Sequence, residues 1–285
     1  MNRLLIAALV PTLLAACASS SPAQSSAEIG MNAPRAAAAT LDQAVAGSWR
    51  DPKNTARDQY RHPRETLAFF GVAPGQTVIE ITPGSGWYSE ILAPILRDDG
   101  QYVAAVTDDA IAGLPKYTYA NNATLRGKFA GNAAVYGAPE VRGFDPKAPT
   151  FGPAGSVDVV LTFRNAHNWV AAGTAEAYFK AFFAVLRPGG TLGVVDHRAK
   201  AGTDLEKMKA SGYLTEQLVI DHALAAGFVA DGSSEVNANP ADTADHPNGV
   251  WTLLPVKRHD AADAAKYAAI GESDRMTLRF KKPAR

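Results

Sequence analysis

The feature that most constrains the fold of this chain is an alternation between short apolar runs and longer amphipathic segments. The apolar runs are rich in β-branched and aliphatic side chains, and they lie at residues 77–81, 102–106, 157–163 and 191–195, with a weaker one near 134–141. Uninterrupted apolar runs of this length are typical of strands that are buried on both faces of a parallel sheet. They therefore predict a parallel sheet at the centre of the fold.

Helical segments separate these runs, and turn residues mark their ends. The segments lie at residues 62–71, 85–96, 174–187 and 215–227. Pro63 stands at a favoured first position of a helix and Gly71 at a favoured end. Pro94 is expected to kink the second helix or to end it early, because proline removes a backbone donor.

The pattern changes after Gly227. A short apolar run near residues 228–230 is followed by a long polar insertion at about 237–273 and by a last apolar run at 276–280. An alternation of strands and helices that ends in a pair of strands is typical of a doubly wound α/β sheet. We therefore expect an α/β fold with a mostly parallel, seven-stranded sheet and an antiparallel C-terminal strand.

Composition excludes several classes of protein. The 28 lysine and arginine residues balance 28 aspartate and glutamate residues, so the chain lacks the basic surplus of a dedicated nucleic-acid binder. The single cysteine excludes a disulfide framework and any zinc or iron–sulfur site built from cysteines. The 6 histidines are scattered and form no pair at helix spacing, so no metal site is expected.

The N-terminus has the pattern of an export signal. Arg3 precedes an apolar run at residues 4–14, which is long enough for the core of a signal peptide but too short to span a bilayer. The Leu-Ala-Ala-Cys sequence that follows resembles a bacterial lipobox, in which the cysteine, here Cys17, is lipidated. An ordinary secretory signal with a chance cysteine is the alternative.

The export signal implies a domain organisation and a location. Residues 1–17 would form the lipoprotein signal peptide, and the Ser/Ala/Pro-rich residues 18–45 a flexible tether. Residues 46–285 would form the folded domain. Ala18 stands where an aspartate typically marks retention in the inner membrane. The resemblance therefore implies a periplasmic protein that lipidated Cys17 anchors in the outer membrane.

A loop with two glycines follows the first predicted strand. It runs from Glu80 through Gly84 to Gly86 and leads into the next helix. Glycines let the backbone approach a ligand closely, and the N–H groups of a helix N-terminus favour negative groups. The loop therefore predicts a binding site for a small ligand at the end of this strand.

This loop and three later motifs resemble the class I S-adenosylmethionine-dependent methyltransferases over about residues 48–285. The glycine-rich first motif and the later landmarks of that family are matched, in family order, by residues 80–86, 158–163, 186–192 and 226–228. Shorter motifs resemble a bacterial group of predicted and often exported methyltransferases, at residues 57–58, 61–63, 83–88 and 239–242. The resemblance implies S-adenosylmethionine as the cofactor and a small molecule as the methyl acceptor.

The resemblance also assigns the residues that would bind the cofactor, which are Glu80, Thr82, Gly84, Gly86, Asp108 and Asn165. Thr82 replaces the usual first glycine of the motif. The acid that binds the ribose hydroxyls in the family has no direct counterpart, and Asp108 is the nearest candidate. A nicotinamide-binding Rossmann domain is the alternative for this loop, but the acid at the strand end and the Arg-Pro-Gly-Gly turn at 187–190 point away from it.

Two histidines follow predicted strands at the edge where a parallel sheet binds its ligands. His167 comes shortly after the run that ends at residue 163, and His197 after the run that ends at residue 195. A neutral histidine with an ordinary pKa of about 6.5 suits the removal of a proton from a methyl acceptor. His167 and His197 are therefore predicted catalytic residues, although a hydrogen-bonded loop histidine is the alternative for each.

Five further residues are candidates for binding or covering a substrate, namely Tyr60, Arg61, Arg164, Arg198 and Trp251. Tyr60 and Arg61 precede the first long helix, where the resembled fold covers its cofactor, although a solvated basic turn is the alternative. Arg164 and Arg198 follow strand ends and would either bind an anionic substrate or pair with nearby carboxylates. Trp251, in the long insertion, would either cover a ligand or pack into the core.

The predicted cofactor and the predicted location conflict, because S-adenosylmethionine is made in the cytoplasm whereas the N-terminus predicts export. Two hypotheses follow. The first is a lipid-anchored methyltransferase that acts on a small molecule. The second is a non-catalytic or repurposed periplasmic protein that binds a small molecule on the same fold, since a fold does not determine a function.

Overall fold

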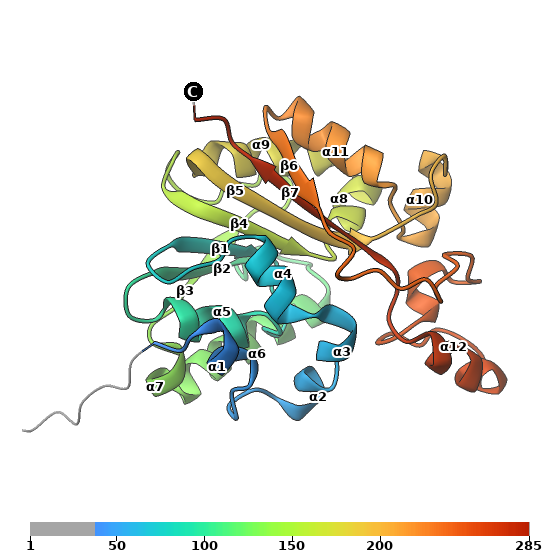
Figure 1. Cartoon of the computed structure of the whole chain (residues 1–285), viewed down its shortest axis with the longest axis horizontal. Helices are drawn as coiled ribbons and strands as arrows, with labels where there is room; N and C mark the ends of the chain where they lie inside the picture. The colour runs from blue at the N-terminus through green and yellow to red at the C-terminus, as the bar shows by residue number, and fades with distance from the viewer. Residues whose placement is uncertain (1–37, 285) are drawn as a thin grey trace, which may run out of the picture. The chain divides into compact units, whose positions relative to one another are not determined.

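The computed structural model describes residues 38–284 (Figure 1). Within these residues the strands form one seven-stranded sheet with the order β3-β2-β1-β4-β5-β7-β6. The strands are β1 (Thr77–Ile81), β2 (Gln101–Thr107), β3 (Glu140–Phe144), β4 (Val157–Phe163), β5 (Leu186–His197), β6 (Val229–Ser233) and β7 (Arg275–Lys281). Strands β1 to β5 are parallel, whereas β7 is antiparallel to both β5 and β6. The expected α/β sheet with an antiparallel C-terminal strand is therefore confirmed.

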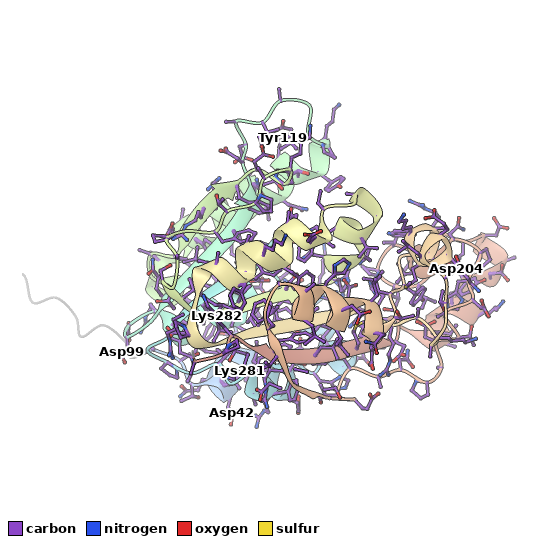
Figure 2. All side chains as sticks on the ribbon, turned by 90° about the horizontal axis from the view of Figure 1, so that it is seen from above. Asp42, Asp99, Tyr119, Asp204, Lys281 and Lys282 are labelled. Carbon is purple, nitrogen blue, oxygen red and sulfur yellow. The ribbon has the colours of Figure 1, made fainter. Side chains whose placement is uncertain are left out.

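Helices cover both faces of the sheet. In β1, Val78 belongs to one hydrophobic cluster and its neighbour Ile79 to another, because successive side chains of a strand point to opposite faces. The helices packed on the Val78 side are α1 (Leu41–Val45), α4 (Pro63–Phe69), α5 (Ser89–Leu96), α6 (Lys116–Gly131) and α7 (Ala133–Tyr136). Those on the Ile79 side are α8 (Ala166–Ala172), α9 (Ala175–Val185), α10 (Leu205–Ser211) and α11 (Glu216–Ala225). Figure 2 shows α9 and α11 side by side across this face.

Helix α5 continues through Pro94 instead of ending early there. A proline leaves the carbonyl four residues before it without its helical partner, which here is the carbonyl of Glu90. The indole Nε1 of Trp49 donates a hydrogen bond to this oxygen over 2.9 Å, and every residue of α5 is buried. A side chain from outside the helix therefore compensates for the proline, which the local sequence pattern does not reveal.

The weak apolar run at residues 134–141 is not a single strand. Its first half lies in α7, which ends at Gly137 with a φ of 70°, and β3 begins only at Glu140. Alanines favour a helix, and a glycine in the left-handed region favours a helix end. The sequence pattern also does not predict α6, because that helix is mostly polar and exposed.

The folded part of the chain begins before the boundary expected at residue 46. Thr40 and Gln43 cap α1 through a reciprocal pair of hydrogen bonds, and Ala44 is fully buried. Caps and packing against α5, rather than a long periodic pattern, stabilise so short a helix. The predicted signal peptide, Cys17 and most of the predicted tether lie outside the described residues. Among the described helices, none combines the length and the apolar character needed to cross a membrane.

The insertion between β6 and β7 is partly helical, although its composition is typical of a loop. It contains the 3-10 helices η1 (Gly249–Thr252) and η2 (Ala261–Asp263) and the helix α12 (Ala264–Ile270), drawn in orange and red in Figure 1. Strand β7 begins opposite the end of β5, where Arg275 pairs with His197. The insertion therefore joins the sheet at the edge where the parallel strands end.

Candidate functional site

A cavity of about 500 Å³ lies at the carboxyl ends of β1, β2 and β4. The strand order reverses at this point, because β2 and β4 lie on opposite sides of β1, and open α/β sheets bind ligands at such a point. The volume is in the range of small-molecule sites. Residues from several segments line the cavity, among them Thr82 and Gly84 after β1, Thr107 in β2, Asn122 in α6 and Asn165 after β4.

The loop after β1 uses its two glycines differently. Gly84 lines the cavity with a φ of 61°, and no atom lies within 4 Å of the place where a Cβ would be. Gly86 has a φ of 91°, and a Cβ there would lie 2.7 Å from Cδ1 of Leu125 in α6. Gly84 therefore leaves space in the cavity, whereas Gly86 allows α6 to pack closely against the loop.

Thr82 also lines the cavity, and its backbone conformation shows why glycine is usual at this position in the resembled motif. Its φ of 50° lies in the left-handed region, which glycine adopts without steric cost and a β-branched residue adopts only against it. The backbone N–H of Thr82 donates to the carbonyl of Ala105 in β2 over 2.8 Å, which helps to hold this conformation. Strain of this kind is commonly stored at functional sites.

Glu80 is buried behind this loop and is not part of the cavity lining. Its Oε2 accepts hydrogen bonds from the hydroxyl of Tyr102 over 2.5 Å and from that of Ser89 over 3.1 Å. Burial raises the pKa of the Glu80 carboxyl to about 7, although the two hydrogen bonds act in the opposite direction. Glu80 thus connects β1, β2 and α5 beneath the cavity, and its direct contact with a cofactor stays a prediction.

The acids that follow β2 lie at the surface rather than in the cavity lining. Asp108 is exposed, and its Oδ1 accepts a hydrogen bond from the backbone N–H of Ala110 over 2.9 Å. Asp109 accepts from the side-chain amide of Asn122 over 2.7 Å, and Asn122 itself lines the cavity. Among residues 38–284 the cavity lining includes no carboxylate. The predicted role of Asp108 at the ribose therefore has no contact to support it and stays a prediction.

The two histidines predicted as catalytic lie together, with Asp196 between them. The Oδ1 of Asp196 lies 2.8 Å from Nδ1 of His167 and accepts from the backbone N–H of His197 over 2.8 Å. Its Oδ2 accepts from the backbone N–H of His167 over 3.0 Å. The Nδ1 of His197 lies 2.5 Å from the hydroxyl of Ser273. Burial lowers the pKa of His197 well below its ordinary value, and His167 lowers it further.

Sequence reasoning missed the central position of Asp196 and the contact with Ser273. The signal for Asp196 was available, because it directly precedes His197 at the end of a predicted strand. No signal pointed to Ser273, which lies 76 positions away from His197 in the chain. Distance along the chain also explains why the scattered histidines gave no metal motif, although two of them meet in space.

His167, Asp196 and His197 offer ligand atoms that all lie within 4.8 Å of one another, so they form a possible metal-binding set that the sequence does not predict. Both oxygens of Asp196 already accept hydrogen bonds, and both Nδ1 atoms have partners. Nearby arginines also act on His197, and positive charge opposes the binding of a cation. The geometry therefore favours a hydrogen-bonded network over metal ligation.

Arg198 is fully engaged in ion pairs at the protein surface. Its guanidinium lies 2.9 Å from Asp274, 2.8 Å from Glu235 and 3.0 Å from Glu216. Hydrogen bonds to these carboxylates, with that of Glu235 first, raise the pKa of Arg198 above its ordinary value. Of the two alternatives for this residue, the structure shows the pairing with carboxylates.

The other candidates for covering a substrate lie near the histidine network. Arg61 is buried, stacks over the ring of Trp87 at 4.8 Å and pairs with Glu272 at 3.1 Å. Tyr60 lines a separate, polar cavity of about 270 Å³ together with Glu272. Trp251 packs partly against the core, and its ring centroid lies 6.4 Å from that of His167.

Comparison with solved structures shows that the chain has the class I methyltransferase fold. An S-adenosylmethionine-dependent methyltransferase from Aquifex aeolicus is 14% identical over 86% of this chain and 99% of its own, with a TM-score of 0.52. The [4+2]-cyclase SpnF is 15% identical over 86% of this chain and 92% of its own, with a TM-score of 0.55. No protein-family model and no curated protein sequence matches the chain. These likenesses describe the fold and leave the reaction open, since one neighbour is named as a cyclase.

Proposed function

We propose that this protein is an S-adenosylmethionine-dependent methyltransferase that acts on a small molecule. The observation that carries the proposal is the cavity at the ends of β1, β2 and β4, which lies at the reversal point of a sheet with the methyltransferase strand order. The histidine and aspartate network at the neighbouring end of β5 adds groups that can move a proton.

The lining of the cavity is compatible with the cofactor. S-adenosylmethionine, when bound, supplies a methyl group on a positively charged sulfur. The open space at Gly84 admits a ligand close to the backbone. The side-chain oxygens of Asn122 and Asn165 offer acceptors to hydroxyl and amino groups, because each amide nitrogen already donates two hydrogen bonds within the protein. Asn122 would serve the ribose in place of the usual acid, because its amide nitrogen donates to Thr107 and Asp109, which leaves its side-chain oxygen to accept from the ribose hydroxyls.

The chain itself would position the acceptor and remove its proton. Asp196 accepts from two backbone N–H groups, and its contact with His167 would put the imidazole proton on Nδ1. Nε2 of His167 is then the basic nitrogen, and Asp196 stabilises the imidazolium after proton transfer. His167 stands two positions after Asn165, so one short segment carries both the proposed base and part of the cavity lining.

Calorimetric titration of the purified protein with S-adenosylmethionine and S-adenosylhomocysteine tests the proposal. We expect saturable heats with the wild type and none with Gly84→Val, because the new side chain would enter the cavity. Gly71→Val is a matched control. Gly71 has a φ of 72° and open space around its Cβ position, as Gly84 does, but it follows α4 and does not line the cavity. The control should bind the cofactor like the wild type.

The second candidate function is a non-catalytic small-molecule-binding protein on this fold. The strained Thr82 and a cavity lining without a carboxylate, among the described residues, favour it. Absence of heat with either ligand at millimolar concentration would remove the methyltransferase and leave this candidate.

The location is a separate part of the proposal and depends on the N-terminal pattern alone. We propose export, lipidation of Cys17 and anchoring in the outer membrane, which places the domain in the periplasm. A periplasmic methyltransferase also needs a source of S-adenosylmethionine outside the cytoplasm.

A further inference from the structure

Arginine side chains gather around one buried carboxylate beside the histidine network. They belong to the segment before α4, to the turn after β4 and to the start of β7, and they are Arg57, Arg61, Arg164 and Arg275. The Nε of Arg57 lies 2.5 Å and the Nε of Arg61 lies 3.1 Å from the carboxylate of Glu272. Arg275 also pairs with Glu272. Burial would raise the pKa of Glu272, but Arg275 and the other arginines outweigh it and lower that pKa to about 2.

The cluster carries more positive than negative charge. The carboxylates that act on Arg61 and Arg164 are Glu272 and, for Arg164, also Asp196. Burial lowers the pKa of Arg61 well below its ordinary value, and Arg164 lowers it further. Burial and then Arg275 lower the pKa of Arg164 to about 10, which still leaves it charged at neutral pH. A charge that is withdrawn from water without a partner is strongly unfavourable.

Arg164 is the member of this cluster whose charge has no partner. Within the described residues its guanidinium makes no ion pair and no hydrogen bond, and its Nε is buried. Its φ of 63° is left-handed, and its backbone N–H donates to Val195 over 2.7 Å. Unlike Arg61 and Arg275, Arg164 is partly exposed as a residue.

Three more nitrogen atoms of the cluster are buried without a partner, namely Nη2 of Arg57, Nη2 of Arg61 and Nε of Arg275. Water can satisfy such donors, but it leaves the excess charge in place. An oxyanion supplies both the missing hydrogen-bond acceptors and a balancing charge, because its oxygens accept from several N–H groups and its charge is negative. The same field disfavours a metal ion at the adjacent histidine pair.

We infer that Arg164 binds the carboxylate or phosphate group of a small anionic molecule, with Arg61 and Arg275 adding to the attraction. Arg164 directly precedes Asn165 of the cavity lining, and its charge acts on His197, so the anion would lie next to both the cavity and the histidine network. If the proposed function holds, on which this identification rests, the anionic molecule is the methyl acceptor. Arg198 differs from Arg164 in this respect, since three carboxylates already pair with it.

The experiment measures anion binding to the full chain without S-adenosylmethionine. Sodium phosphate, sodium acetate and sodium chloride are compared at equal ionic strength by thermal denaturation, and the dissociation constants are measured by calorimetry. We expect saturable stabilisation by phosphate or acetate but not by chloride. Arg164→Gln should weaken this binding by about tenfold or more, as expected for the loss of a charge-assisted hydrogen bond. Arg164→Lys should retain part of it, because lysine keeps the charge and loses the planar fork.

Arg187→Gln is the matched control, since Arg187 is an exposed arginine that pairs with Asp158 near the start of β4 and should not affect anion binding. Arg164→Gln should fold normally, because it removes an unpaired charge and breaks no ion pair among the described residues. Equal effects of the three salts on the wild type, or wild-type affinity in Arg164→Gln, would overturn the inference. Anion binding without any cofactor binding would instead support the anion site and refute the proposed methyltransferase. Failure of the anion site and failure of the proposed function therefore give different results.

Discussion

The buried carboxyl of Glu80 makes the stability of this protein depend on pH in a way that one substitution should remove. Glu80 lies between Tyr102 of β2 and Ser89 of α5, and both hydroxyls donate to its Oε2. Burial raises its pKa from 4.5 to about 7. Glu80→Gln keeps the shape and the hydrogen-bonding capacity of this group but cannot ionise.

The sign and the magnitude of this pH dependence follow from the difference between the pKa values of Glu80 in the folded and unfolded states. A carboxyl whose pKa is higher in the folded than in the unfolded state favours folding below pH 4.5 and loses this contribution as the pH rises to about 7. At about 1.4 kcal/mol per pKa unit, the loss for Glu80 is on the order of 3 kcal/mol. Above pH 7 the contribution stays constant. The Gln variant should therefore gain stability relative to the wild type by about this amount between pH 4.5 and 8.

Urea denaturation at several pH values from 4.5 to 8 measures this difference for the wild type and Glu80→Gln. Other titrating groups contribute equally to both proteins and cancel. Glu65→Gln is the control, because Glu65 is an exposed carboxylate in α4, and its curve should follow that of the wild type. If the free energies of unfolding of wild type and Glu80→Gln stay a constant distance apart over this range, the carboxyl is not neutral in the folded protein and the reasoning is wrong.

Three further predictions concern the reaction, the core and the N-terminus. His167→Ala and Asp196→Asn should each reduce methyl transfer by about 10²-fold or more while cofactor affinity is retained, because they remove the proposed base and its orienting partner; unchanged turnover would end this role. Gly193→Ala should destabilise the domain by about 1–3 kcal/mol in urea denaturation. Its Cβ would lie 2.7 Å from the ring of Phe70, whereas Gly131→Ala, with open space around it, should be tolerated. Cys17→Ser should abolish incorporation of a labelled fatty acid in cells, and equal labelling of both proteins would refute the anchor.

Two pairs of residues show which properties of the site can be predicted from the sequence and which cannot. Gly84 and Gly86 belong to one motif, but only the structure shows α6 packed against Gly86 and open space at Gly84. Arg164 and Arg198 both follow predicted strands. From the sequence, either arginine would bind an anionic substrate or pair with nearby carboxylates. Asp274 and other acids from distant segments pair with Arg198, whereas no carboxylate among the described residues forms an ion pair with Arg164. The position of a polar residue at the strand ends was therefore predictable, but its partner was not.

The sequence alone determined the parallel sheet, the helices with clear caps and the edge at which a ligand would bind. Buried strands and capped helices are local patterns, because burial on both faces and the geometry of turns act on consecutive residues. Only the tertiary structure decided which charges and hydrogen-bonding groups meet, such as Asp196 with His167, or Glu272 with Arg57 at 215 positions along the chain. Contacts of this kind arise when packing brings distant segments together, and their energies depend on burial that no local pattern specifies.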